Sequence, residues 1–221
     1  MSVRHPYYPT DIFIANFKEN DKGMFNILAG FFGGIAGLLL VLAGTAFRGY
    51  KASVARKLAL VWLLLSGCIH VILEGHFCVY HADIASRMDF LSQVWKEYAR
   101  GDSRYMIQDT FTICMETVTA FVEGPLCLLT VWSFVNHHSS RYLLQLIVSL
   151  GQFYGCVLYF FTEWVDGFVH GPLYHPIYFW FYFVFMNLIW IVIPFALMLD
   201  SWIQLSSVQT LHDKQLANKR Q

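Results

Sequence analysis

The sequence predicts an all-α integral membrane protein, built as a bundle of five transmembrane helices with a central membrane-embedded cavity. Five long apolar stretches run through the 221 residues. Hydrophobic residues make up 57% of the chain and charged residues only 14%, whereas a soluble domain has roughly 25% charged residues. Ionisable residues nevertheless lie inside the second and third stretches, at His70, Glu74, Glu116 and Glu123. Because a charge near the bilayer centre costs at least ~2.5–3.5 kcal/mol, we expect these groups to face a cavity and not lipid.

Each apolar stretch is long enough to cross a hydrocarbon core of ~30 Å at ~1.5 Å per helical residue. The predicted spans are residues 26–47, 58–80, 110–135, 142–162 and 177–199. They divide the chain into a polar N-terminal segment (1–25), a five-helix transmembrane domain (26–203) and a polar C-terminal tail (204–221). We expect the tail to fray. The N-terminal segment has no apolar core of a cleavable signal, so the first span is expected to direct insertion.

Composition disfavours several classes of partner and cofactor. The formal net charge is zero, which offers no basic face for nucleic acid. The five cysteines are odd in number and include no CxxC pair, so buried thiols are expected and not a disulfide framework or a zinc site. The nine histidines lack the repeated HxxHH-type clusters of membrane di-iron enzymes, and no GxGxxG phosphate cradle follows a strand. The sequence therefore predicts neither a metal nor another cofactor.

The first span is rich in glycine, with Gly30-xxx-Gly34 and Gly33-xxx-Gly37 spacings. Small residues at this spacing let two helices approach closely, either within the bundle or in a homodimer. Lys and Arg are almost equally divided between the segments on the two sides of the membrane. The positive-inside rule therefore does not decide the orientation of the protein in the membrane. The compact basic link at residues 48–57 and the basic tail favour a cytosolic C-terminus.

Depth in the membrane can be counted inward from the face that carries the loop 81–109. At ~1.5 Å per residue the polar side chains of the second, third and fifth spans fall into levels at ~9, ~15 and ~20 Å. The pairs that this count predicts are Glu74 with Glu116, His70 with Asn187, and Glu123 with Trp190. Two carboxylates at one depth with a histidine below them favour a functional site.

The azimuth of the polar residues agrees with their depth. His70 and Glu74 are i, i+4 on one helix face. Further polar stripes are Thr112, Glu116, Thr119 and Glu123 on the third span, and Gln145, Ser149, Gln152 and Tyr159 on the fourth. A single polar residue in a span is more often an interhelical hydrogen-bonding group, and Glu123 beside Gly124-Pro125 suits either a helix break or a site. The stripes together predict one shared cavity.

Several segments resemble the emopamil-binding protein (EXPERA-domain) family over nearly the whole chain, from about residue 5 to Asp200. The strings that carry the resemblance are IHVILEGHF (69–77), LSQVWKEYARGDSRY (91–105), CMETVTA (114–120), GPL (124–126), LQLIVSLGQFYG (144–155) and YFWFYFVFMN (178–187). The resemblance implies a cofactor-free, five-helix protein of the endoplasmic reticulum membrane or nuclear envelope. It also implies an enzyme of sterol biosynthesis, which moves a sterol double bond from C8=C9 to C7=C8.

The family's catalytic positions are matched by His70, Glu74, Glu116, Thr119, Asn187 and Trp190. The expected substrate contacts are Thr112, Glu123, Gln152, Tyr105 and Phe183. Two positions depart from the mammalian members of the family, which have an aromatic residue in place of Glu123 and Trp in place of His76. Neither departure removes a catalytic position.

The isomerisation adds a proton at C9, forms a carbocation at C8 and removes a proton from C7. We therefore expect Glu116 and His70 to transfer protons, with Glu74 stabilising charge and Trp190 presenting its π face to the cation. Which of Glu116 and His70 is the acid stays open. Cationic amphiphilic amines such as emopamil or tamoxifen are expected to bind as mimics of the carbocation.

Two other functions stay open at this point. The first is a sterol- or amine-binding protein without catalysis, like the non-isomerase relatives; the second is a proton-coupled transporter, although the sequence shows no internal repeat. The role of loop 81–109 is also open, between a structural cap and contact with the sterol. Trp95 and Tyr98 suit an interfacial cap, and a salt-bridged plug would be formed by Lys96, Glu97, Arg100, Asp102 and Arg104.

Overall fold

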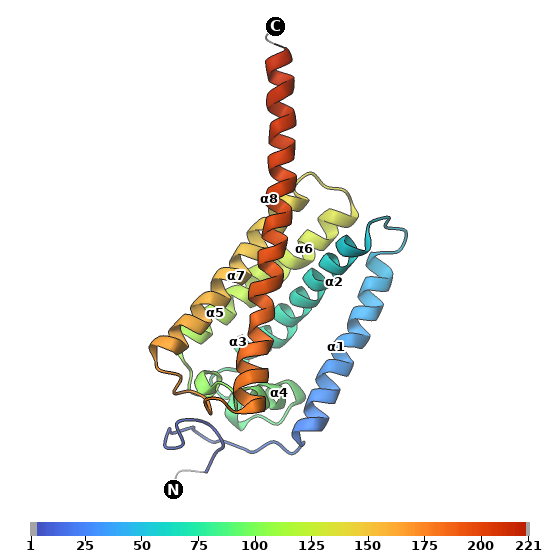
Figure 1. Ribbon diagram of the computed structural model, residues 1–221. Coiled ribbons are helices and arrows are strands. Elements are labelled where there is room, and N and C mark those ends of the chain that lie inside the picture. The colour runs from blue at the N-terminus through green and yellow to red at the C-terminus, as the bar shows by residue number, and fades with distance from the viewer. Residues whose placement is uncertain (1–3, 220–221) are drawn as a thin grey trace.

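The computed structural model describes residues 4–219, so both extreme ends of the expected N-terminal segment and tail (1–3 and 220–221) lie outside the described residues. The chain is helical almost throughout (Figure 1). The α-helices are α1 (Met24–Ala46), α2 (Val54–Cys68), α3 (Gly75–Tyr80), α4 (Phe90–Tyr98), α5 (Thr110–Val118), α6 (Gly124–Val135), α7 (Arg141–Val165) and α8 (Met186–Asn218). Wider π-helical segments are η1 (Ile69–Glu74), η4 (Thr119–Glu123) and η5 (Pro176–Phe185), and short 3-10 turns are η2 (Ile84–Ser86) and η3 (Ser103–Tyr105).

Five continuous helical rods within residues 4–219 are long and apolar enough to cross a membrane, which confirms the predicted fold class. The rods are Met24–Ala46, Val54–Tyr80, Thr110–Val135, Arg141–Val165 and Pro176–Asn218. The second rod begins before its apolar stretch because Ser53 caps it, accepting a hydrogen bond from the backbone nitrogen of Arg56 at 3.2 Å.

The three π-helical segments all lie in the rods that carry the predicted catalytic residues. The segment η1 contains His70 and Glu74, and η4 runs from Thr119 to Glu123. Pro125 follows η4 and has no N–H, so the preceding turn cannot keep its ordinary α-helical hydrogen bond. The segments η1 and η4 contact each other, which places their side chains on one shared wall.

The rods differ in how tightly they are packed. The helix α7 lies along α8, and α2 lies along α6, whereas α1 stands at one edge of the bundle and contacts α2 and α4 (Figure 1). The C-terminal part of α8 projects beyond the bundle as a single helix with exposed side chains. The expectation of a frayed tail is therefore wrong as far as Asn218. Residues 204–218 contain good helix formers and no Gly or Pro, which accounts for the continued helix.

The end of the bundle opposite the C-terminus is closed by a cap, defined here as residues 4–23 together with residues 81–109 (Figure 1). The two parts are joined by hydrogen bonds. The Tyr7 hydroxyl donates to the Lys96 carbonyl at 3.0 Å, and the Ser103 hydroxyl donates to the Tyr8 carbonyl at 2.5 Å. Polar residues at the N-terminus are thereby incorporated into the folded domain.

Candidate active site

A cavity of about 560 Å³ lies between α1, the π-helical segments, α7, α8 and the cap. Its volume falls within the range of ~300–1,000 Å³ that is usual for small-molecule sites. Most of its wall is apolar, with residues such as Ile27, Phe31, Ile35 and Leu39 of α1 along one side. A rigid hydrocarbon with few polar groups suits such a wall. The polar residues that interrupt it are described below.

His70 is held between two polar partners. Its Nδ1 lies 2.7 Å from both oxygens of Glu74, and its Nε2 lies 3.0 Å from Nε2 of Gln152. Since the Gln152 amide nitrogen can only donate, His70 Nε2 accepts and Nδ1–H donates to Glu74. His70 is only 3% exposed, so this oriented imidazole is shielded from bulk water.

Glu116 is placed by a tyrosine from the cap. The Tyr105 hydroxyl donates to Glu116 Oε1 at 2.6 Å, and the Thr119 hydroxyl lies 3.4 Å from Oε2 while donating to the Glu116 carbonyl at 3.0 Å. The carboxyl group of Glu74 is its other close polar neighbour. The structure therefore joins His70, Glu74 and Glu116 into one row of proton-carrying groups, at the level predicted for the two carboxylates.

The fifth rod is shifted relative to the predicted depth levels. The predicted pairing of Asn187 with His70 is wrong, because the Asn187 amide donates to the Tyr98 hydroxyl at 2.8 Å and to the Phe183 carbonyl at 2.7 Å. Trp190 takes the place next to His70, with ring centroids 6.3 Å apart. The cause is η5, whose ten residues form wider turns and advance less per residue than the α-helix assumed in the count.

The other predicted substrate contacts divide into two groups. Tyr105, Glu123 and Gln152 line the cavity. Thr112 and Phe183 are not among the described residues that line it. Thr112 is fully covered in the first turn of α5, which Asp109 caps, and Phe183 packs into an aromatic cluster with ring centroids 5.5 Å from Tyr159 and 5.6 Å from Phe179.

The cap supplies cavity residues that the sequence reasoning left undecided. Trp95, Glu97 and Tyr98 form part of the cavity wall together with Tyr105. Burial raises the pKa of the Tyr98 and Tyr105 hydroxyls above their ordinary value, so both stay protonated and available as donors. In the sequence, the long and specific string at residues 91–105 is what indicates that this loop does more than connect two helices.

Behind the cavity wall the cap is tied to α7 by a buried ionic network. Arg104 contacts Asp102 at 2.6 Å, and Asp102 also accepts the Tyr159 hydroxyl at 2.5 Å. Arg104 further donates to the Thr162 hydroxyl at 2.8 Å and lies 3.5 Å from Glu163. Part of the expected plug therefore exists, and it anchors the cap to α7.

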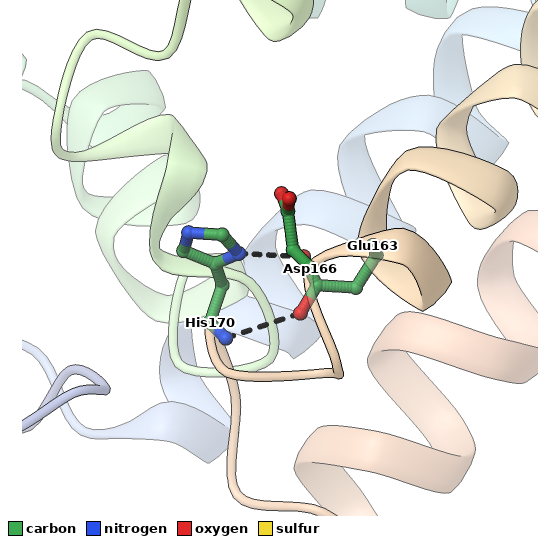
Figure 2. Close-up of side chains that lie close together, drawn as sticks. All are labelled: Glu163, Asp166 and His170. Carbon is green, nitrogen blue, oxygen red and sulfur yellow. Dashed lines mark hydrogen bonds and ion pairs between the residues drawn. The ribbon is translucent and has the colours of Figure 1, made fainter.

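Glu163, Asp166 and His170 bring three potential metal-ligand atoms within 4.8 Å of one another (Figure 2). Both interactions drawn in Figure 2 join His170 to Glu163, through Nδ1 at 2.6 Å and the backbone N–H at 3.1 Å. These contacts and the nearby Arg104 guanidinium already engage the Glu163 carboxylate. The hydrogen bond to Glu163 raises the pKa of His170. Glu163 and His170 are thus an ion-paired part of the anchoring network.

Comparison with known proteins finds one matching family model and several similar enzymes. The family model described as EXPERA (expanded EBP superfamily) matches residues 90–201. The chain is 46% identical to the 3-beta-hydroxysteroid-Delta(8),Delta(7)-isomerase of Rattus norvegicus, over 96% of this chain and 93% of that protein. It is 42% identical to the enzyme of the same name from Cavia porcellus, over 98% and 95%. An isomeliandiol synthase of Ailanthus altissima is 34% identical over 97% and 99%.

Proposed function

This chain belongs to the EXPERA (expanded EBP) superfamily, and we propose that it is a 3β-hydroxysteroid-Δ8,Δ7-isomerase of sterol biosynthesis. The observation that carries the proposal is the row of His70, Glu74 and Glu116 on the wall of a large apolar cavity. A sterol ring system fits the apolar wall, and the row offers acid, base and negative charge where a cation must form. Residues 26–203 form the catalytic unit in this proposal.

The reaction moves the double bond from C8=C9 to C7=C8. A proton is added at C9, the electron pair of the double bond forms the new C–H bond, and a cation remains at C8. Loss of the C7 proton then returns an electron pair and forms the new double bond. We assign these two transfers to Glu116 and His70, and the buried position of both excludes water that would capture the cation.

The surrounding residues act on the acids and on the cation. Tyr105 and Thr119 orient Glu116, while Glu74 stabilises charge beside His70. Trp190 stands close enough to His70 to present its face to a cation at C8. Asn187 acts indirectly, because its amide donates a hydrogen bond to the Tyr98 hydroxyl and so positions this hydroxyl in the cavity wall.

Conversion of cholest-8-en-3β-ol or zymosterol to the Δ7 product by purified protein, absent from a protein-free membrane blank, tests this function. We expect Glu116→Gln, Glu74→Gln and His70→Ala each to lower turnover strongly while the proteins stay folded. Wild-type turnover in all three would refute the mechanism. A protein that binds these sterols without forming product would instead be a non-catalytic sterol-binding relative.

The same cavity supports a second ligand class. An ammonium group of a cationic amphiphilic amine would lie where the C8 cation forms, between Glu74 and Glu116, with its apolar body along α1. Such amines are therefore expected to compete with the sterol. Loss of one carboxylate in Glu116→Gln should weaken amine binding more than sterol binding.

We further propose that the protein resides in the endoplasmic reticulum membrane, including the nuclear envelope, with the C-terminus in the cytosol. The α8 extension would then project into the cytosol and the cap would face the lumen (Figure 1). Protease protection of sealed microsomes distinguishes the two orientations, since the exposed helix of residues 206–219 is cleavable only on the outer face. Protection of this helix in intact microsomes would reverse the assignment.

A homodimer is also part of the proposal. Gly33, Gly34 and Gly37 of α1 have open space where a side chain would stand, with no other described residue within 4 Å. The glycine face is thus not used for packing within the protomer and suits a second copy of α1. Light scattering of wild type and Gly33→Leu/Gly37→Leu in detergent tests this: a dimer that becomes a monomer supports it, and a monomeric wild type refutes it.

A further inference from the structure

The end of the bundle from which α8 projects is positively charged, whereas the cap at the other end is close to neutral (Figure 1). At the α8 end, the residues of the ranges 47–57, 136–141 and 200–219 include seven Lys or Arg and two Asp. The cap includes seven Lys or Arg and eight Asp or Glu. An excess of positive charge beside a bilayer attracts anions, and this excess lies outside the cavity described above.

Two loops lie side by side at the positively charged end: the loop between α1 and α2 and the loop between α6 and α7. The ring centroids of Tyr50, in the first loop, and His137, in the second, are 5.7 Å apart. Arg56 in the first turn of α2 donates to the Tyr142 hydroxyl of α7 at 3.4 Å, which joins the starts of these two helices. Arg56 also contacts Asp200 at 2.7 Å, so the negative charge of Asp200 is already balanced.

Four further basic residues stand on these loops or in the helical turns that follow them: Arg48, Lys51, Lys57 and Arg141. The first three are exposed, and none of the four forms an ion pair with another residue between residues 4 and 219. The helices α2 and α7 both begin here and have no acidic residue in the first turn. A helix N-terminus carries partial positive charge, so both termini add to the charge of the side chains. These four residues are called the basic face below.

Exposed apolar side chains continue the basic face toward the bilayer. Val54 and Leu58 of α2 flank Lys57 in the sequence, and Trp132 and Leu143 are exposed on α6 and α7. A water-soluble polyanion or an acidic peptide would use the charges alone. A phospholipid matches both parts of the surface, because its phosphate can contact the bases while its acyl chains run along the apolar side chains.

We propose that the basic face binds the headgroups of anionic phospholipids in the adjacent leaflet. A bound headgroup would hold the loop between α1 and α2 against the start of α7. The helix α1 stands at the edge of the bundle and contacts α2 and α4, so a lipid at this loop would steady it at the end away from the cap. The lipid site is separate from the cavity and does not depend on the isomerase function.

Selective retention of lipids tests the proposal. The immobilised full-length protein is equilibrated with detergent micelles that contain equal amounts of dioleoyl phosphatidylserine and dioleoyl phosphatidylcholine, and the retained lipids are measured by mass spectrometry. We expect the wild type to retain about fivefold more phosphatidylserine or better, because each nearby Lys or Arg adds to the attraction. Raising NaCl from about 0.05 to about 0.5 M should lower this preference, because salt screens exposed charges. Equal retention of the two lipids, or a preference that salt does not change, would overturn the proposal.

The variant Arg48→Gln/Lys51→Gln/Lys57→Gln removes the three exposed charges of the basic face and leaves the buried contacts of Arg56 in place. Its preference for phosphatidylserine should fall to about twofold or less, because the attraction depends on the number of bases near the headgroup. A triple variant that keeps the preference of the wild type would show that these residues do not bind the lipid.

The matched control is Lys18→Gln/Lys22→Gln/Arg87→Gln, which removes the same charge from the cap. We expect the control to keep the preference of the wild type, and an equal loss in both triple variants would refute a local site. Soluble glycerophosphoserine is a further arm, since it carries the headgroup without acyl chains. It should displace the retained lipid poorly, and displacement at the concentration at which phosphatidylserine itself competes would refute the assignment to a membrane lipid.

Discussion

Removal of one hydroxyl in the cap, by Tyr105→Phe, should slow the isomerisation without unfolding the protein. Tyr105 donates to Glu116 Oε1 at 2.6 Å, while its ring stacks on Trp95 with centroids 4.6 Å apart and meets Phe77 at 5.2 Å. Phenylalanine keeps both ring contacts. The change therefore isolates the hydrogen bond to the carboxylate.

The expected magnitude follows from that bond. A hydrogen bond to a charged group contributes about 1.5–3 kcal/mol, and each ~1.36 kcal/mol is a factor of ten in rate. If the whole contribution is used to hold Glu116 for proton transfer, kcat/KM falls by about 10- to 150-fold. The Thr119 hydroxyl still lies 3.4 Å from the other oxygen, which limits the loss of orientation.

The assay is the initial rate of Δ7-sterol formation by purified protein, followed by gas chromatography with mass detection at several substrate concentrations. Tyr182→Phe is the matched control, since the Tyr182 hydroxyl also bonds a buried carboxylate, Glu97, at 3.2 Å, but in the cap. We expect the control to retain most activity. Activity of Tyr105→Phe within twofold of the wild type, at an unchanged melting temperature, would refute the role given to this bond.

Three further predictions concern stability. Arg104→Met should cost about 3–5 kcal/mol of unfolding free energy in denaturant titrations, because it leaves Asp102 buried without its partner at 2.6 Å, whereas Arg87→Met at an exposed pair should cost less than ~1 kcal/mol. The raised pKa of His170 means that its stabilising ion pair is fully present below about pH 6.5 and is lost as pH rises through the folded-state pKa. As the pH is raised through the folded-state pKa, the melting temperature of the wild type should therefore fall more than that of His170→Gln. Melting temperatures that change equally with pH in the two proteins would contradict this prediction. Deletion of residues 206–221 should leave activity and melting temperature unchanged, since every described residue from 206 onward is exposed; a marked loss of either would show that the extension supports the bundle.

The spans and the main acids could be predicted because bilayer insertion imposes simple constraints on sequence. A stretch of about twenty apolar residues predicts a transmembrane span. A carboxylate within such a span is too costly to occur without a polar partner. Depth and helical period then sufficed to group His70, Glu74 and Glu116, because these residues lie close to the face from which the count began.

The prediction failed where the helix itself departs from the α-helical period. No local pattern in the sequence distinguishes the π-helical run Pro176–Phe185 from an α-helix, so a depth count at the α-helical rise overestimates the depth of every residue after it. The error accumulates along the run, so it misplaced Asn187 although its helix was correctly identified. A similar limit applied to the cap, whose cavity-facing side chains depend on tertiary contacts with residues 4–23.

The burial of the site follows from the proton balance of the proposed reaction. One proton enters at C9 and one leaves at C7, so a complete turnover exchanges no net proton with water. If different groups give and take these protons, the proton must return from one to the other before the next cycle. Glu74 contacts His70 at 2.7 Å and neighbours Glu116, which makes it the shortest return path. An enzyme with such an internal return needs no water channel to its acids, and the cap can close over them to protect the cation. On this reasoning Glu74→Gln should slow repeated turnover more than the first turnover in a single-cycle experiment.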